Sequence, residues 1–96
     1  METRIAIFKG KQVRRILHGN EWWFSVVDVC QALIESADSG AYWRKLKQRL
    51  KEEGSKVVTF CHGLKLPAPD GKMRETDCAN TEGIFRIIQS IPSAKA

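Results

Sequence analysis

Apolar and polar residues alternate along the first quarter of the chain. Residues 4–8 have the two-residue period of a strand, and the Lys-Gly-Lys sequence at 9–11 predicts a turn into a second strand over 13–17. A second turn signal at 18–20 precedes three aromatic residues at 22–24, which favour a short third strand. The pattern predicts an antiparallel meander in which one of the two adjacent tryptophans is buried and the other is partly covered.

After the meander, the apolar period lengthens to that of a helix. Ser25 and Asp28 have the spacing of a capping box, and the apolar residues that follow recur at helical intervals as far as Leu33. A polar break comes next. We expect Ser39 to cap a second helix that closes at Gly54.

The second half of the chain predicts mixed structure. Residues 57–60 are expected to form a strand, and residues 64–66 and 72–76 a hairpin whose tight turn uses an Asp-Gly pair. Asn80 or Thr81 is expected to cap a last helix. The broad apolar face of that helix consists of Ile84, Phe85, Ile87, Ile88 and Ile91. The predicted fold class is α+β, with an N-terminal meander, two helices, a hairpin and a C-terminal helix.

Length and charge narrow the class of protein. Ninety-six residues, 43% of them apolar, suffice for one small domain over 1–96, and a net charge of +5 favours anionic partners. No apolar run approaches the roughly 20 residues of a membrane-spanning helix, and the N-terminus lacks a signal-peptide pattern. Three cysteines without framework spacing are typical of reduced thiols. We expect a cytoplasmic protein with no disulfide, no cofactor and no membrane contact.

The sequence YWRKLKQRLK at 42–51 concentrates positive charge within the second predicted helix. At about 100° per residue, one group of cations forms a stripe beside the apolar sector, and a second group flanks the other side. The stripe consists of Arg44, Lys47 and Lys51, and the second group of Lys45 and Arg49. An ordinary solvated amphipathic helix is one hypothesis, and contact with nucleic-acid phosphates is the other. Gln48, among these cations, is a candidate base reader.

Further positive charge falls on the two predicted hairpins. Lys65, Lys72 and Arg74 would extend the basic surface of the helix onto the second hairpin, a layout that winged DNA-binding modules use. The secondary candidates, in the first hairpin, are Lys9, Lys11, Arg14 and Arg15. A solvated strand edge, protected by its charge from pairing, explains these four equally well. Because the two arginines are adjacent, one of them must point toward the core side or lie at a bulge.

Aromatic stacking and zinc binding also have candidate residues. Trp22 and Trp23 could stack on unpaired bases, but packing in the core explains them, and Trp43, better. The soft metal ligands are Cys30, Cys61, His62 and Cys78. None of them has the short Cys-to-Cys spacing of structural zinc sites, so we expect no metal site, and Cys30 and Cys78 are expected in the core.

A nuclease is the enzyme class for which the chain offers a pattern. Asp70 and Lys72 form an Asp-x-Lys sequence, with Asp38 or Glu53 as conceivable partner carboxylates. The Asp-Gly pair after proline is in the first place a turn. His18 has no evident catalytic partner. We expect no enzyme.

Three segments carry a resemblance to a known family. They are GNEWWFSVVDVCQAL, YWRKLKQRLKEEG and LKLPAPDGKMRETDCANTEGIFRIIQSIPSAKA. The most specific pieces are WWFSVVDV, YWRKLK and TDCANTEGIFRIIQSIPS, because each mixes core, cap or turn residues in one run. Over nearly the whole chain, the sequence resembles the Bro family N-terminal domain (Bro-N). That domain is found in phage and prophage antirepressor-type proteins, in baculovirus repeated-ORF proteins and in DNA-damage-inducible protein D.

The resemblance implies DNA binding and regulation of phage or stress genes, without enzymatic activity. The leading hypothesis is a domain that docks on double-stranded DNA through the basic helix and the basic hairpin. The alternative is a protein-interaction module that sequesters a repressor or another regulatory partner. Family members continue into another helix, so we expect this domain to lack that helix. An apolar face near Ile84, Ile88 and Ile91 would then be open to a homodimer.

Overall fold

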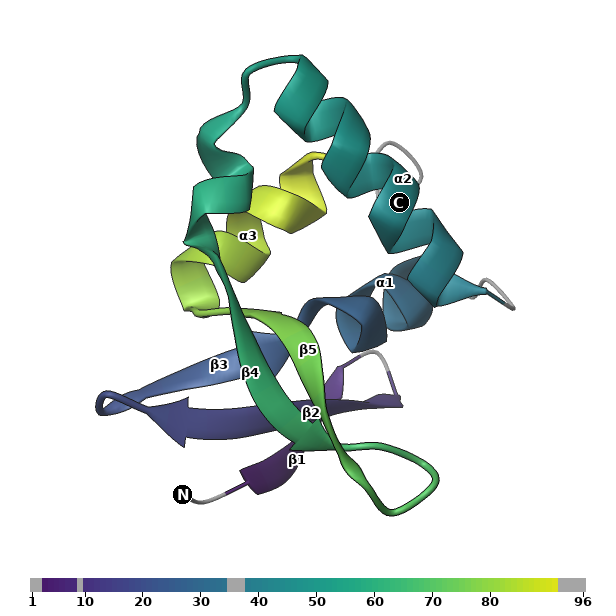
Figure 1. The fold of residues 1–96 in the computed structure, drawn as a ribbon, viewed down its shortest axis with the longest axis vertical. Helices are drawn as coiled ribbons and strands as arrows, with labels where there is room; N and C mark the ends of the chain where they lie inside the picture. Colours follow the sequence, from purple (N-terminus) through teal and green to yellow (C-terminus); the bar gives the residue numbers. More distant parts are fainter. Residues whose placement is uncertain (1–2, 9, 35–37, 92–96) are drawn as a thin grey trace.

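Five antiparallel strands form one sheet in the computed structural model, which describes residues 3–8, 10–34 and 38–91 (Figure 1). The strands are β1 (Thr3–Phe8), β2 (Lys11–His18), β3 (Glu21–Ser25), β4 (Cys61–Pro67) and β5 (Met73–Ala79). Their order across the sheet is β1-β2-β3-β5-β4, so the meander is joined to the hairpin through the pairing of β3 with β5. The predicted α+β class and the predicted meander are confirmed.

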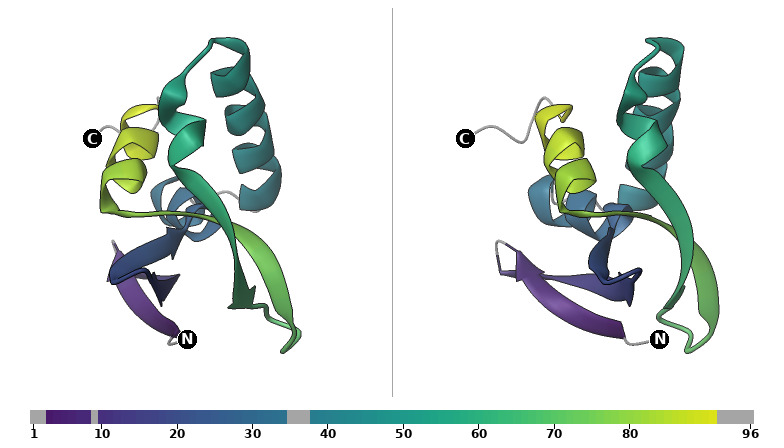
Figure 2. Two further views of the ribbon diagram at one scale, coloured as in Figure 1. Left: turned by 60° about the vertical axis from the view of Figure 1, so that its left-hand side comes forward. Right: turned by 90° about the vertical axis from the view of Figure 1, so that its left-hand side faces the viewer.

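Helices cover one side of this sheet (Figures 1 and 2). They are α1 (Val26–Ile34), α2 (Ser39–Glu52) and α3 (Thr81–Gln89), together with the short 3-10 helix η1 (Lys56–Phe60). Asn80 caps α3 as predicted, but α2 is capped by Asp38, whose carboxylate accepts the backbone N–H of Ala41. The prediction of Ser39 as the cap was therefore wrong by one residue. None of the described helices is long and apolar enough to cross a membrane.

The predicted strand at 57–60 is the 3-10 helix η1 instead. Its position in the sheet explains the difference: Cys61 already pairs with Ala79, and the chain beyond Ala79 turns into α3. A strand before Cys61 would have no neighbour for its backbone groups, so this segment satisfies them locally. Val57 and Val58 pack against the helices, which accounts for their apolar character.

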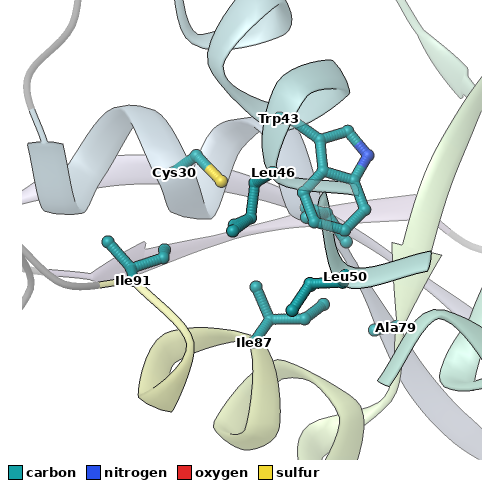
Figure 3. Close-up of a cluster of buried hydrophobic side chains, with 8 residues drawn as sticks. Cys30, Trp43, Leu46, Leu50, Ala79, Ile87 and Ile91 are labelled. Carbon is teal, nitrogen blue, oxygen red and sulfur yellow. The ribbon is translucent and has the colours of Figure 1, made fainter. Parts of the chain in front are cut away.

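The main core lies between the three α-helices and β5 (Figure 3). The buried residues are Val26, Cys30, Trp43, Leu46, Leu50, Ala79, Ile87 and Ile91. Ile84 packs against this cluster, but Phe85 is 61% exposed, so the apolar face of α3 is narrower than predicted. Of the face expected to support a homodimer, Ile91 is buried, and Ile84 and Ile88 are partly buried. The homodimer itself stays a prediction.

A second core joins the meander to the hairpin. Ile16 and Trp23 of the meander pack with Leu66 and Cys78 of the hairpin, and all four are buried. Trp22, on the opposite face of β3, is only partly buried, which confirms the predicted division between the two tryptophans. The hairpin therefore lies over the meander as well as beside it.

The ion pair between the partly buried Arg14 and the buried Asp28 connects three elements. The Arg14 side chain donates from Nε and Nη2 to the Asp28 carboxylate, at 2.8 and 2.9 Å, and its third nitrogen donates to the backbone carbonyl of Pro67 at 2.8 Å. Asp28 also accepts the backbone N–H of Arg14. Ser25 Oγ accepts the backbone N–H of Asp28, so the predicted cap of α1 is formed, although Asp28 turns to Arg14 and not back to Ser25. Of the two adjacent arginines, Arg14 is the one that points inward, and β2 pairs with β1 without a bulge.

We predict that Asp28→Asn lowers the free energy of unfolding by about 2–3 kcal/mol, because it leaves the Arg14 guanidinium half-buried without its counter-charge. Urea unfolding followed by tryptophan fluorescence measures this. Glu82→Gln is the matched control, since it removes an exposed ion pair with Arg86 on the surface of α3 and should cost less than about 0.5 kcal/mol. Equal stability of the two variants would contradict a special role for Asp28.

Candidate nucleic-acid interface

Helix α2 separates its apolar and basic side chains as the sequence predicts. Trp43, Leu46 and Leu50 are buried in the main core. The exposed side chains on the rest of the helix include Arg44, Lys45, Gln48, Arg49 and Lys51. Lys47 is half-buried at the border between the two sectors, next to β5. Trp43 therefore packs in the core, as predicted.

Lys47 and Trp43 meet at one carboxylate on β5. Asp77 Oδ2 accepts a hydrogen bond from the Lys47 ammonium at 2.9 Å and another from the Trp43 indole N–H at 2.8 Å. Burial raises the pKa of Asp77, but the hydrogen bonds from Lys47 and Trp43 and the charge of Lys51 outweigh it, and the pKa lies below its ordinary value of 3.8. The carboxylate is thus ionised at neutral pH and holds the basic stripe of α2 beside the hairpin.

Lys65 continues this surface onto the hairpin. In the β4–β5 pairing, Gly63 is opposite Asp77 and Lys65 is opposite Glu75. Directly opposed residues, and residues two apart on a strand, share one face of a sheet, so Lys65 and Asp77 point to the same side. We call the surface formed by Arg44, Lys47, Lys51 and Lys65 the basic face. Two acidic residues, Glu75 and Asp77, accompany Lys65 on the hairpin part of this face.

The other two hairpin cations lie elsewhere. Arg74 pairs with Leu66, which faces the second core, and its guanidinium forms an ion pair with Asp70 in the turn. Lys72 is exposed in that turn, where its backbone N–H donates to Asp70 at 3.0 Å. The structure therefore brings one of the three predicted hairpin cations, Lys65, into the basic face and leaves the other two at the tip.

Lys45 and Arg49 border a recess on the other side of α2. Tyr42 and Leu46 complete its lining, and its volume is about 220 Å³. Arg49 donates to the backbone carbonyl of Ser90 just after α3, at 3.4 Å, and lies 3.9 Å from Glu53. The cations of α2 thus fall into two groups, one beside β5 and one beside the end of α3.

Of the secondary candidates, Arg14 is taken up by the internal ion pair with Asp28. The Arg15 guanidinium lies 4.1 Å from the centroid of the Trp22 ring and covers it. This contact also reduces the surface with which Trp22 could stack on a base. Lys11 is exposed at the start of β2, and Lys9 lies outside the described residues.

The candidate metal ligands are spread over both cores. Cys30 is in the main core and Cys78 in the second, and burial raises their pKa to about 11 and about 12. Burial likewise raises the pKa of Cys61 to about 11. His62 packs its ring edge against Trp23 at the surface. Within residues 3–8, 10–34 and 38–91, no group of three or more metal-ligating side chains could hold a metal ion.

The carboxylates of the nuclease alternative have structural partners. Asp70 belongs to the hairpin turn, Asp38 caps the start of α2, and Glu53 lies at the other end of that helix. His18 accepts the indole N–H of Trp23 at its backbone carbonyl, and its ring contacts Trp23 edge-on. These positions bring none of the three carboxylates together.

Asp77 is the residue of this surface that sequence reasoning missed. The signal that could have found it is weak: a buried tryptophan needs an acceptor for its indole N–H, and Trp43 is predicted to be buried. Nothing in the sequence says which of the acidic residues supplies that acceptor, because α2 and β5 are far apart along the chain.

We predict that Asp77→Asn destabilises the domain by about 1–2 kcal/mol at pH 7, since the charge-assisted bond to Lys47 is lost. A carboxyl with a lowered folded pKa stabilises the protein above its ordinary pKa and loses that effect as the pH falls through the folded pKa. The difference between wild type and variant should therefore shrink below about pH 4. Urea unfolding between pH 3 and 7 measures it. A difference that persists unchanged at pH 3 would show that the charge of Asp77 is not the cause.

Comparison with known proteins assigns the chain to a family. No curated protein and no solved structure matches the chain. The model of the BRO family, N-terminal domain (Bro-N), matches residues 12–96, which include β2 after its first residue, β3 to β5, the helices described above and the whole basic face. The match confirms the resemblance noted in the sequence: the chain belongs to the BRO family and carries its N-terminal domain.

Proposed function

We propose that the domain binds double-stranded DNA and acts in a regulator of the phage-antirepressor type. Membership of the BRO family is consistent with such a regulatory role. DNA binding is supported by the charge of the chain and by the arrangement of its cations, since Lys and Arg on one surface are what a phosphate backbone attracts.

The observation that carries the proposal is the continuity of the basic face. The Lys47–Asp77 ion pair holds α2 beside β5, so Arg44, Lys47 and Lys51 lie next to the hairpin face that carries Lys65. A duplex is long and rigid, and its phosphates can be contacted together only by cations that share one surface. In the left view of Figure 2, α2 and the hairpin lie along the same side of the molecule.

Gln48 lies at the centre of the exposed surface of α2, four residues after Arg44 and three before Lys51, so these residues are neighbours on the helix. Its amide donates to Glu52 at 3.2 Å in an exposed contact that a base edge could replace. In the proposed complex, the cations position the duplex, and Gln48 is the residue placed to read a base.

We predict that replacing Arg44, Lys47 and Lys51 by alanine weakens binding to all duplex sequences and reduces the slope of log K against log salt by about two to three units, since each phosphate contact contributes about 0.9. Fluorescence anisotropy with a labelled random duplex, across a salt series, measures this.

The control removes three cations outside the basic face, with Lys45, Arg49 and Lys56 changed to alanine. It should change the slope by less than about one unit, because these positions make no phosphate contact in the proposed complex. Unchanged affinity in the triple variant of the basic face, or equal effects of the two triple variants, would contradict DNA binding through the basic face.

A second candidate function is the capture of a regulatory protein, and the recess on α2 favours it. Protein-binding sites have apolar or aromatic anchors at the centre and charge at the rim. Tyr42 and Leu46 supply the apolar lining, and Lys45 and Arg49 the positive rim. The chemistry that fits is an acidic segment with one apolar anchor residue, which is a different partner from a duplex.

We expect a fluorescein-labelled peptide with leucine among aspartates to bind, and the Lys45→Ala/Arg49→Ala variant to bind it at least about fivefold more weakly, a loss of roughly 1 kcal/mol. The Arg44→Ala/Lys51→Ala variant is the control. It loses two positive charges as well, but from the basic face and not from the recess, so it should keep its affinity for the peptide. Anisotropy titrations compare the two. If both variants lose affinity equally, the attraction is general and the recess is not a binding site.

A further inference from the structure

An exposed methionine lies at the end of the basic face. Met73 is 54% exposed and, with Phe85, is one of two large apolar side chains that are exposed within residues 10–34 and 38–91. It opens β5 and is opposite Pro67, so it shares the hairpin face of Lys65, Glu75 and Asp77. The basic face thus ends in an apolar tip formed by Met73 and the exposed Pro67.

The hairpin turn that carries this tip is rigid. Ala68 and Lys72 are joined by a backbone hydrogen bond of 2.8 Å, and the N–H of Gly71 donates to the carbonyl of Ala68 at 2.9 Å. Gly71 has a φ of 85°, which a residue with a side chain adopts only with strain. Asp70 fixes the turn further by accepting from Lys72 and Arg74, and the guanidinium of Arg74 balances its charge. An apolar tip on a rigid turn needs no ordering before it is inserted into a ligand.

Proteins that bend DNA insert apolar side chains such as Met or Pro between base pairs from the minor groove, while cations hold the neighbouring phosphates. Met73 follows Lys72, which is exposed in the turn, and shares its face of the hairpin with Lys65, so cations lie on both sides of it along the hairpin. Met73 takes no part in either buried cluster, so burial in a core does not explain its apolar side chain.

The distance between Met73 and Asp77 along β5 suits a hairpin whose tip enters the DNA groove next to the phosphates that α2 contacts. Met73 is four residues from Asp77, where Lys47 of α2 is held, and a strand rises about 3.3 Å per residue, so the two positions are about 13 Å apart. The minor groove is only about 6 Å wide. With α2 against the phosphates, a tip about 13 Å further along β5 has the reach to enter the adjoining groove. In Figure 2, the hairpin tip lies away from the helices in both views. At the base of the tip, the Pro67 carbonyl accepts a hydrogen bond from Arg14 of β2 at 2.8 Å.

We propose that Met73 is a wedge that enters the minor groove, unstacks a base step and bends the duplex. This inference rests on the proposed function, and it adds a preference for deformable steps. Pyrimidine–purine steps such as TA unstack easily, whereas A-tracts are stiff. The domain therefore favours a duplex with a TA step where the hairpin tip lies, although the wedge makes no hydrogen bond to a base.

The test uses a duplex of about 30 base pairs with a dye at each end and a central TA step. Anisotropy reports binding and energy transfer reports bending in the same sample, with every protein at saturating concentration. Wild type should shorten the end-to-end distance as expected for a bend of roughly 20–90°. Met73→Gln, which keeps the length of the side chain but makes it polar, should bind and leave the duplex straight. Met73→Leu, which stays apolar, should bend it as wild type does.

The outcomes separate the two proposals. A wild-type protein that saturates the duplex without changing energy transfer overturns the wedge and leaves DNA binding intact. Bending by Met73→Gln equal to that of wild type overturns it too. A wild-type protein that binds no duplex overturns both. An A-tract in place of the TA step should weaken wild-type binding severalfold and leave Met73→Gln unaffected, and equal affinities of wild type for the two duplexes would also count against the wedge.

Discussion

Arg14 and Asp28 join three parts of the domain that are separate in sequence: the meander, the first helix and the hairpin. The guanidinium binds the carboxylate at the start of α1 with two nitrogens and reaches the Pro67 carbonyl at the end of β4 with the third. The carboxylate also satisfies the backbone N–H of Arg14. A half-buried ion pair is costly to desolvate and is retained only when its hydrogen bonds are complete, and here they fix the geometry of all three parts together.

The position of the basic face follows from this arrangement. The hairpin is attached to the meander by the β3–β5 pairing and the second core, and it is attached to α2 through Asp77. Once these contacts are made, the stripe on α2 and Lys65 on β4 have no freedom to lie on different surfaces. Arg44 and Lys65 are more than twenty residues apart in sequence. The Asp77 carboxylate and the β4–β5 pairing bring them onto one surface.

Local patterns predicted most of the elements, because a strand, a capped helix and an Asp-Gly turn depend on neighbours in sequence. The strand expected at 57–60 failed because pairing depends on a partner, and the partner strand ends at Ala79. Phe85 fits the apolar period of α3, yet the core on that side is complete without it. For the candidate site, helical spacing predicted the stripe on α2. Helical spacing also predicted that Lys45 and Arg49 lie on the other side of the helix. The contact of Arg49 with the end of α3 and the role of Asp77 depend on which elements pack beside α2, and no local pattern encodes that packing.

The Lys47–Asp77 pair has a consequence for how an anion would be exchanged at this surface. Lys47 is already paired with Asp77. A phosphate that replaces Asp77 as the partner of Lys47 leaves the Asp77 carboxylate without a counter-charge, so the carboxylate must then attract a cation from solution. Such an uptake opposes the release of cations from DNA. A salt series would therefore count the net charge that is neutralised, and that count would be smaller than the number of lysines and arginines touching the duplex.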